Sequence, residues 1–196
     1  MVMRLRVAGW AFAVALAVLG VCVVAEAAIS ARAAQVRIAE NVFRFHVLAN
    51  SNSRADQRLK LMVRDGVLEY VQEMGADLRD GDGGLAGIER RAEGVVREAG
   101  FDYAVRAVVG WYDFPTQEYG EIALPAGRYH ALRIEIGEAA GNNWWCVIYP
   151  NICVAGSAAV MPAESRARLQ GVLTPEEFQL ITGGAPLRFR LLEMMR

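Results

Sequence analysis

Two cysteines in the last third of the chain, Cys146 and Cys153, have the spacing that most directly suggests covalent chemistry. A disulfide between them would close a short loop and stabilise the fold by about 2.5 kcal/mol on a chain-entropy estimate. The alternative is a pair of reduced thiols, one of them a nucleophile or a metal ligand beside His46 or His130. We favour the disulfide, because the domain is predicted to lie outside the cytosol, where thiols tend to be oxidised. The spacing is also wider than the C-x2-4-C of zinc modules, so we expect no metal site.

The two histidines have different expected surroundings. His130 shares a strand face with apolar residues, which favours a structural place in the core. His46 falls on the polar face of an earlier strand, shortly before Asn50, and the end of a strand that leads into a helix is a common place for functional side chains. The sequence has no G-x-S-x-G, H-E-x-x-H or glycine-rich dinucleotide motif. We therefore expect no catalytic residues and no cofactor.

Aromatic residues gather around the first of the two cysteines. Trp144, Trp145 and Tyr149 lie in one short segment, and Trp111 and Tyr112 would lie near them if the predicted strands pair. Such side chains fill cores, anchor protein interfaces or stack on sugars, and composition does not separate these uses.

The strands that would hold these residues are indicated by alternation of apolar and polar side chains. Alternation predicts strands over residues 43–48, 103–114 and 128–137. The apolar run at residues 144–149 is either a buried strand or an aromatic loop. Residues 187–191 alternate again and predict a last strand.

Helix signals lie between these strands. Ser53 and Asp56 resemble a capping box ahead of an amphipathic helix that ends at Gly75. A second amphipathic helix is predicted over residues 85–99, and a short one from Pro175 to Thr182. We expect a single α+β domain in which a mainly antiparallel sheet packs against the first two helices.

The N-terminus carries the most apolar segment of the chain. Arg4 and Arg6 precede an uncharged run over residues 7–25, which as a helix would span roughly 28 Å, close to the thickness of a bilayer core. Positive charge before the run and Glu26 after it predict that the N-terminus stays in the cytosol and the remainder lies beyond the membrane.

The chain therefore divides into three expected parts. Residues 1–27 are a signal peptide or a membrane anchor, because small residues around positions 25–27 and 31–33 suit a signal peptidase but the apolar run is longer than usual. Residues 28–41 form a tether. The exported domain covers residues 42–196, with residues 155–172 as a connector. The formal net charge of −1 argues against nucleic acid as a partner.

Two segments carry a resemblance to a known family. Phe45-His46-Val47-Leu48-Ala49-Asn50-Ser51 resembles the opening of the stage II sporulation protein R family. Gly141-Asn142-Asn143-Trp144-Trp145-Cys146-Val147, followed by Pro150 and Cys153, is similar to the signature of that family.

The resemblance implies a function that composition and periodicity do not show. Such proteins are made in the forespore and exported to the intermembrane space, where they activate a membrane-embedded aspartic protease that processes a mother-cell pro-sigma factor. With the aromatic cluster, this suggests a partner-binding site, further marked by His46 and Asn50. Its core residues are Asn142, Asn143, Trp144, Trp145, Cys146 and Cys153.

Two other functions fit the residues alone. One is an enzyme that acts on the cell wall or in the extracytosolic space through Cys146 or His46. The other is a peptidoglycan-binding module that uses the tryptophans. A hyper-reactive cysteine would favour the first, and sedimentation with purified wall would favour the second.

Overall fold

The computed structural model describes residues 2–75, 78, 84–150, 152 and 163–182, and the structural statements below concern these residues. In chain order the elements are α1 (Val2–Asn41), β1 (Phe43–Leu48), α2 (Arg54–Met74), α3 (Leu85–Glu98), β2 (Val105–Phe114), β3 (Gln117–Tyr119), β4 (Ile122–Leu124), β5 (Gly127–Ile136), β6 (Asn143–Tyr149), α4 (Ala163–Val172) and α5 (Pro175–Thr182).

The strands form a four-stranded sheet in the order β2-β5-β1-β6, and β3 and β4 form a separate hairpin. β2 is antiparallel to β5, and β6 is antiparallel to β1, whereas β1 and β5 run parallel. The α+β class and the mainly antiparallel sheet are confirmed. The parallel central pair was not anticipated, because alternation identifies a strand but not its direction. Parallel neighbours need a long crossover, here supplied by α2, α3 and β2.

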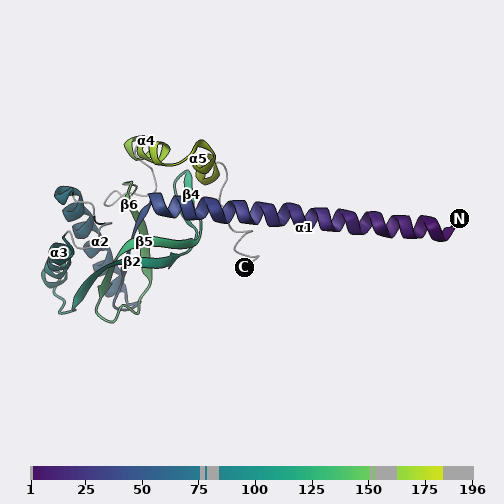
Figure 1. Ribbon diagram of the computed structural model, residues 1–196. Coiled ribbons are helices and arrows are strands. Elements are labelled where there is room, and N and C mark those ends of the chain that lie inside the picture. Colours follow the sequence, from purple (N-terminus) through teal and green to yellow (C-terminus); the bar gives the residue numbers. More distant parts are fainter. Residues whose placement is uncertain (1, 76–77, 79–83, 151, 153–162, 183–196) are drawn as a thin grey trace.

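One face of the sheet packs against α2 and α3, as predicted (Figure 1). Apolar residues of α2 at helical spacing, among them Leu59, Val63 and Val67, meet Phe45 and Leu132 in one core cluster. Burial of this apolar stripe is what holds an amphipathic helix on a sheet.

Both ends of α2 lie where the sequence predicts them. The Ser53 side chain accepts a hydrogen bond from the Asp56 backbone N–H at 3.1 Å, which satisfies one of the unpaired amides of the first turn. Gly75 ends the helix with φ of 60°, a left-handed conformation that glycine adopts without strain.

The other face of the sheet is also covered, which the sequence did not indicate. A second core cluster joins residues from α1, the β3–β4 hairpin, α4 and α5 to Tyr129 and Val147 of the sheet. Every residue of β1 is consequently buried. The period-2 pattern predicted a half-buried β1, and that prediction is wrong because both layers close over this strand.

α1 is a single helix that continues through the segment predicted to be a tether. Its last turns pack on the sheet, and Ile38 and Ala39 are buried there. Residues 10–29 include many large apolar side chains that are exposed. No helix within the described residues combines the length and apolar content that a membrane crossing requires.

The remaining predictions are met in part. β6 is a strand rather than an aromatic loop, and α5 lies where the capping signals placed it. The second half of the predicted connector, residues 163–172, forms α4. The predicted last strand at residues 187–191 lies outside the described residues.

Replacing Ile38 by Ala tests whether the end of α1 belongs to the folded domain. Ile38 is 0% exposed, so the substitution should lower the free energy of unfolding by about 2–4 kcal/mol. Val36, which is 48% exposed on the same helix, is the control, and Val36→Ala should change stability by less than about 0.5 kcal/mol. Urea titration of the full chain in mild detergent measures both. Equal, small effects would mean that α1 does not dock.

Candidate functional site

Two turns that carry the predicted signature meet at one end of the sheet. Leu48, the last residue of β1, pairs with Asn143 on one side and with Glu135 on the other. The turns that follow β1 and β5 are therefore adjacent. Backbone bonds join them, from Gly141 N to Ala49 O at 2.9 Å and from Ala140 N to Asn50 O at 3.2 Å.

The Asn50 side chain is part of this junction. Its Nδ2 donates to Asp56 Oδ2 at 3.0 Å, and its Oδ1 accepts from the Glu138 backbone N–H at 3.0 Å. Hydrogen bonds from Ser51 and Asn50 lower the pKa of Asp56, so the carboxylate stays charged and keeps its donors. Asn50 thus holds the two turns together, and its amide is already engaged by the protein itself.

Asn142 and Lys60 extend the same network towards β6. The Asn142 backbone N–H donates to Asn52 Oδ1 at 2.8 Å, and its carbonyl accepts from Lys60 Nζ at 2.9 Å. Lys60 is buried and also donates to Gln57 Oε1 at 2.6 Å. Burial, with the nearby charge of Arg64, lowers the pKa of Lys60. The Asn142 side chain itself remains exposed.

The two neighbouring tryptophans point to opposite faces of the sheet, because successive side chains of a strand alternate. Trp144 lies on the α2 side, 6.2 Å from the Phe45 ring, with Arg64 Cζ 4.7 Å from its centroid. Trp145 lies on the other side and stacks on His46 at 5.0 Å. The structure therefore does not bring Trp144 and Trp145 into one patch, and a partner would meet them separately.

His46 is buried, not on a polar face, since the second layer covers it. Its ring centroid lies 5.0–5.2 Å from those of Trp145, Tyr112 and Phe114. The rings of Phe114 and Trp145 are themselves 4.7 Å apart. Among the residues that the structure describes, neither ring nitrogen has a hydrogen-bond partner. Burial, followed by the charges of Arg133 and Arg44, lowers the pKa of His46 to about 3. The imidazole is neutral at ordinary pH.

The arrangement of His46 and Cys146 bears on the enzymatic alternative. Cys146 is buried in the cluster under α2 and α3, whereas His46 contacts aromatic residues of the opposite layer. A nucleophile and its general base need to be within hydrogen-bond reach. These two side chains are separated by the sheet and cannot form such a pair.

The described residues bear on the metal alternative but not on the disulfide. Within the described part of the chain, no group of three potential ligands among His, Cys, Asp and Glu could hold a metal ion. Cys153 lies outside the described residues, so the disulfide stays a prediction. His130 is half-buried between Trp111 and Phe43 at 5.4 and 5.2 Å. Its position at the margin of the core agrees with the structural place predicted for it.

Arg44 is a residue whose importance the sequence analysis missed. It is 0% exposed, its Nε donates to Cys146 O at 3.0 Å, and its Nη2 donates to Tyr119 Oη at 2.9 Å. Its Cζ lies 4.3 Å from the Phe114 ring centroid, so aromatic faces provide much of its electrostatic environment. The sequence does place this arginine between Phe43 and Phe45 in a predicted strand. That position indicates a buried cation only if both faces of the sheet are known to be covered.

One surface near the signature remains accessible. We define the α2–β6 surface as Leu61, Arg64, Asn142 and Trp144. Leu61 and Asn142 are exposed, and Arg64 and Trp144 are half-buried. Leu61 and Arg64 are three residues apart on α2 and so share a helix face. The surface combines an apolar side chain, an amide and a cation stacked on an indole.

Comparison with known proteins identifies relatives of this chain. The sequence profile described as stage II sporulation protein R matches residues 39–159. Stage II sporulation protein R of Bacillus subtilis (strain 168) is 32% identical over 125 residues, which cover 60% of this chain and 56% of that protein. The match thus spans little more than half of that relative. No solved structure matches the chain.

The low pKa of His46 predicts how stability depends on pH. An unfolded chain protonates this histidine below its ordinary pKa of 6.5, but the folded chain does so only near 3. Stability should therefore fall as the pH drops below 6.5, by up to about 1.4 kcal/mol per pH unit. The pKa values of Asp56 and Glu177 are also lowered, from ordinary values of 3.8 and 4.5. The stability that these two carboxylates contribute is therefore lost only at a pH below those values.

Denaturant titrations between pH 5 and 6.5 measure the histidine contribution separately. His46→Phe, which keeps an aromatic ring among its aromatic neighbours, should flatten most of the slope in that window. His130→Phe is the matched control and should flatten it less, since His130 is only half-buried. An unchanged slope in His46→Phe would contradict the assignment.

Proposed function

Because this chain belongs to the stage II sporulation protein R family, we propose that it is an exported sporulation signal. Made in the forespore, it acts from the intermembrane space on a membrane-embedded aspartic protease, which then removes the pro-sequence of a mother-cell sigma factor. It acts by binding, and binding activates the protease only if the active conformation is bound more tightly than the inactive one.

The observation that carries the contact site is the α2–β6 surface. The stretch matched to the family, residues 39–159, includes all four of its residues. Arginine and tryptophan are the side chains most enriched at the energetic centres of interfaces. Here Arg64 and Trp144 are already stacked at 4.7 Å, so little conformational freedom is lost when a partner binds.

The export step is supported by the character of the N-terminal segment. Trp10, Val21 and Ile29 of α1 are exposed, and such a run of large apolar side chains is unfavourable in water. We propose that residues 1–27 deliver the domain across the forespore membrane as a signal peptide or an anchor. A net charge of −1 gives no support to nucleic acid as a partner.

The two alternatives receive less support from the geometry. An enzyme that pairs Cys146 with His46 would need these residues on one face of the sheet, and they lie on opposite faces. A wall-binding platform built from Trp144 and Trp145 faces the same difficulty. The signalling function needs neither pair.

Replacing Trp144 by Ala should reduce processing of the pro-sigma factor at least about tenfold, which is the scale of losing an interface anchor. The assay is co-expression of this chain with the protease and its substrate, scored by the ratio of processed to unprocessed sigma factor. Trp111→Ala is the matched control. Trp111 is 49% exposed and stacks on its cross-strand neighbour His130, which contacts Phe43 on the same face of the sheet. Trp111 lies towards the opposite end and should tolerate the change. Normal processing by a folded, exported Trp144→Ala chain would rule the contact out.

Thiol labelling tests the predicted disulfide and the enzymatic alternative together. Without reductant, Cys146 and Cys153 of the exported full-length chain should resist alkylation, and both should react once the protein is reduced and unfolded. Cys22 is a free thiol and serves as the internal positive control, because it should react without reductant once the membrane is dissolved and the chain is unfolded. A hyper-reactive Cys146 in the folded protein would favour a catalytic cysteine over a structural one.

A further inference from the structure

The last turns of α1 are built into the domain. Ala34 and Ile38 are buried against the sheet, and Gln35 lies directly over Gly127, the first residue of β5. A Cβ placed on Gly127 would come within 2.2 Å of Gln35 Nε2. The Gln35 side chain therefore packs directly on the backbone of β5, and a larger residue at position 127 would require this amide to move.

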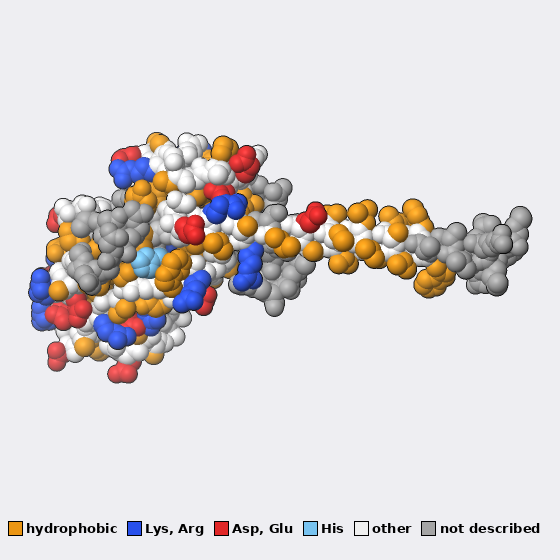
Figure 2. Space-filling model, viewed as in Figure 1, with side chains coloured by type: hydrophobic (Ala, Val, Ile, Leu, Met, Phe, Trp, Pro, Cys, Tyr) orange, Lys and Arg blue, Asp and Glu red, His pale blue; other side chains and the backbone are white. Residues whose placement is uncertain are grey.

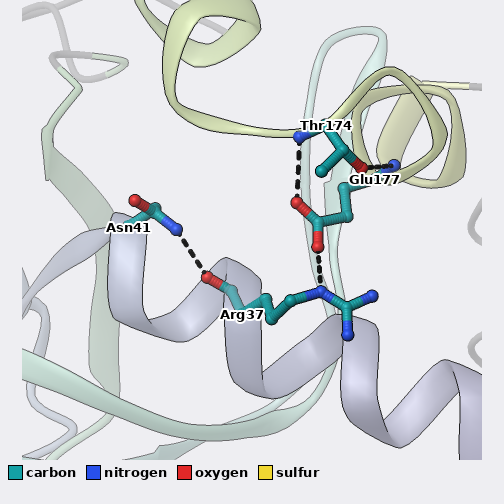
Figure 3. Close-up of polar contacts among 4 residues, drawn as sticks. All are labelled: Arg37, Asn41, Thr174 and Glu177. Atoms are coloured by element: carbon teal, nitrogen blue, oxygen red, sulfur yellow. Dashed lines mark hydrogen bonds and ion pairs between the residues drawn. The ribbon is translucent and has the colours of Figure 1, made fainter.

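A buried carboxylate fastens the same turns to α5 (Figure 3). Arg37 Nε donates to Glu177 Oε1, while Glu177 Oε2 accepts from the Thr174 backbone N–H at 3.0 Å. Burial raises the pKa of Glu177, but the bonds from Arg37 and Thr174 outweigh it and the pKa is lowered overall. Glu177 thus caps α5 and binds Arg37 of α1 with the same charged group, which helps to fix the last turns of α1 on the domain.

The helix leaves the domain from the end opposite the signature turns. β1 begins at Phe43, immediately after α1, and β5 begins at Gly127 beneath Gln35. Because β1 and β5 are parallel, both start at the same end of the sheet and both turns follow at the other. Figure 1 shows α1 running away from the body, and in Figure 2 its middle part stands clear of the domain with apolar side chains on every visible side.

No break separates the apolar part of α1 from the docked part. Glu26 and Ala34 are eight residues apart in one continuous helix, a length of roughly 12 Å. The candidate cleavage site at residues 31–33 directly precedes the docked turn that begins at Ala34 and is part of the same helix. A hydrogen-bonded helix is a poor protease substrate, since cleavage concentrates at exposed loops.

The far end of the domain presents positive charge. Arg54 and Arg58 are exposed on the first turns of α2. Arg64 beyond them is instead paired with Asp65 at 2.7 Å and adds little net charge. The carboxylate of Asp56 is buried and hydrogen-bonded, so it does not neutralise the surface. This charge suits a partner segment that carries acidic side chains.

We propose that α1 is retained and acts as a rigid stalk that presents the α2–β6 surface to an acidic extracytosolic segment of a protein in the facing membrane. The inference rests on the proposed function, because it takes α1 to be embedded in the forespore membrane and the protease to be in the membrane opposite. The fixed helix sets both the height and the orientation of the surface. A flexible tether of equal length would set neither.

Two substitutions of equal length test the stalk in the full chain. The chain is reconstituted in one population of liposomes, which is mixed with a second population that carries the protease and encloses its substrate. In one variant, residues 27–33 other than Arg32 are replaced by Gly and Ser. In the control variant they are replaced by Ala, Glu and Lys, which preserve the helix. The flexible variant should lower processing by about tenfold. A linker without stiffness lowers the effective concentration of the α2–β6 surface at its partner on about that scale. The helical variant should match the native chain.

Proteolysis provides a second readout that does not need the protease partner. Trypsin should cut after Arg32 of the native chain about tenfold more slowly than after an arginine kept at position 32 of the flexible variant, because helix opening must precede cleavage. Mass spectrometry of the membrane-bound active protein should show an N-terminus ahead of residue 27.

The outcomes separate the stalk from the proposed function. If the native chain supports processing and the flexible variant does so equally, the stalk is wrong while the signalling function stands. An active protein whose N-terminus lies at residue 28 or 34 also overturns it. If the native chain gives no processing, the proposed function fails, and rapid trypsin cleavage after Arg32 of the native chain would overturn the stalk as well.

Discussion

The parallel pairing of β1 with β5 is the constraint on which the rest of this molecule depends. It aligns the starts of the two strands, so the docked end of α1 and the first residue of β5 meet at one end of the sheet. It equally aligns their ends, so the two signature turns meet at the other. An antiparallel pairing would have scattered these features. The parallel pairing of these two strands therefore places the N-terminal helix and the candidate contact surface at opposite ends of the sheet.

The central position of β1 also explains why residues in and beside the signature segments differ in role. β1 lies between two packed layers, so Arg44 and His46 are core residues with unusual electrostatics. Asn50 and Lys60 are engaged in bonds that hold the turns and α2 in place. Arg64 and Trp144, at the outer edge of this group, reach solvent. A family signature can thus mark the support of a surface as much as the surface itself.

The sequence was sufficient for features set by neighbouring residues and insufficient for those set by distant ones. The caps of α2 at Ser53 and Gly75 follow from local chemistry and were predicted. The direction of β1 relative to β5 is a long-range property that alternation does not encode. The burial of His46 depends on a second layer formed partly by α1, whose last turns show no strong apolar periodicity. The opposition of Trp144 and Trp145 was foreseeable from strand alternation, once residues 144–149 were known to form a strand.

The most direct test of the account is site-specific photo-crosslinking in sporulating cells. A photoreactive amino acid at position 142, beside Trp144, should form an adduct with the membrane-embedded protease. The same probe at position 128, an exposed site at the opposite end of β5, should form none. Adducts with the protease from position 128 and none from position 142 would contradict the proposed orientation and the contact surface together.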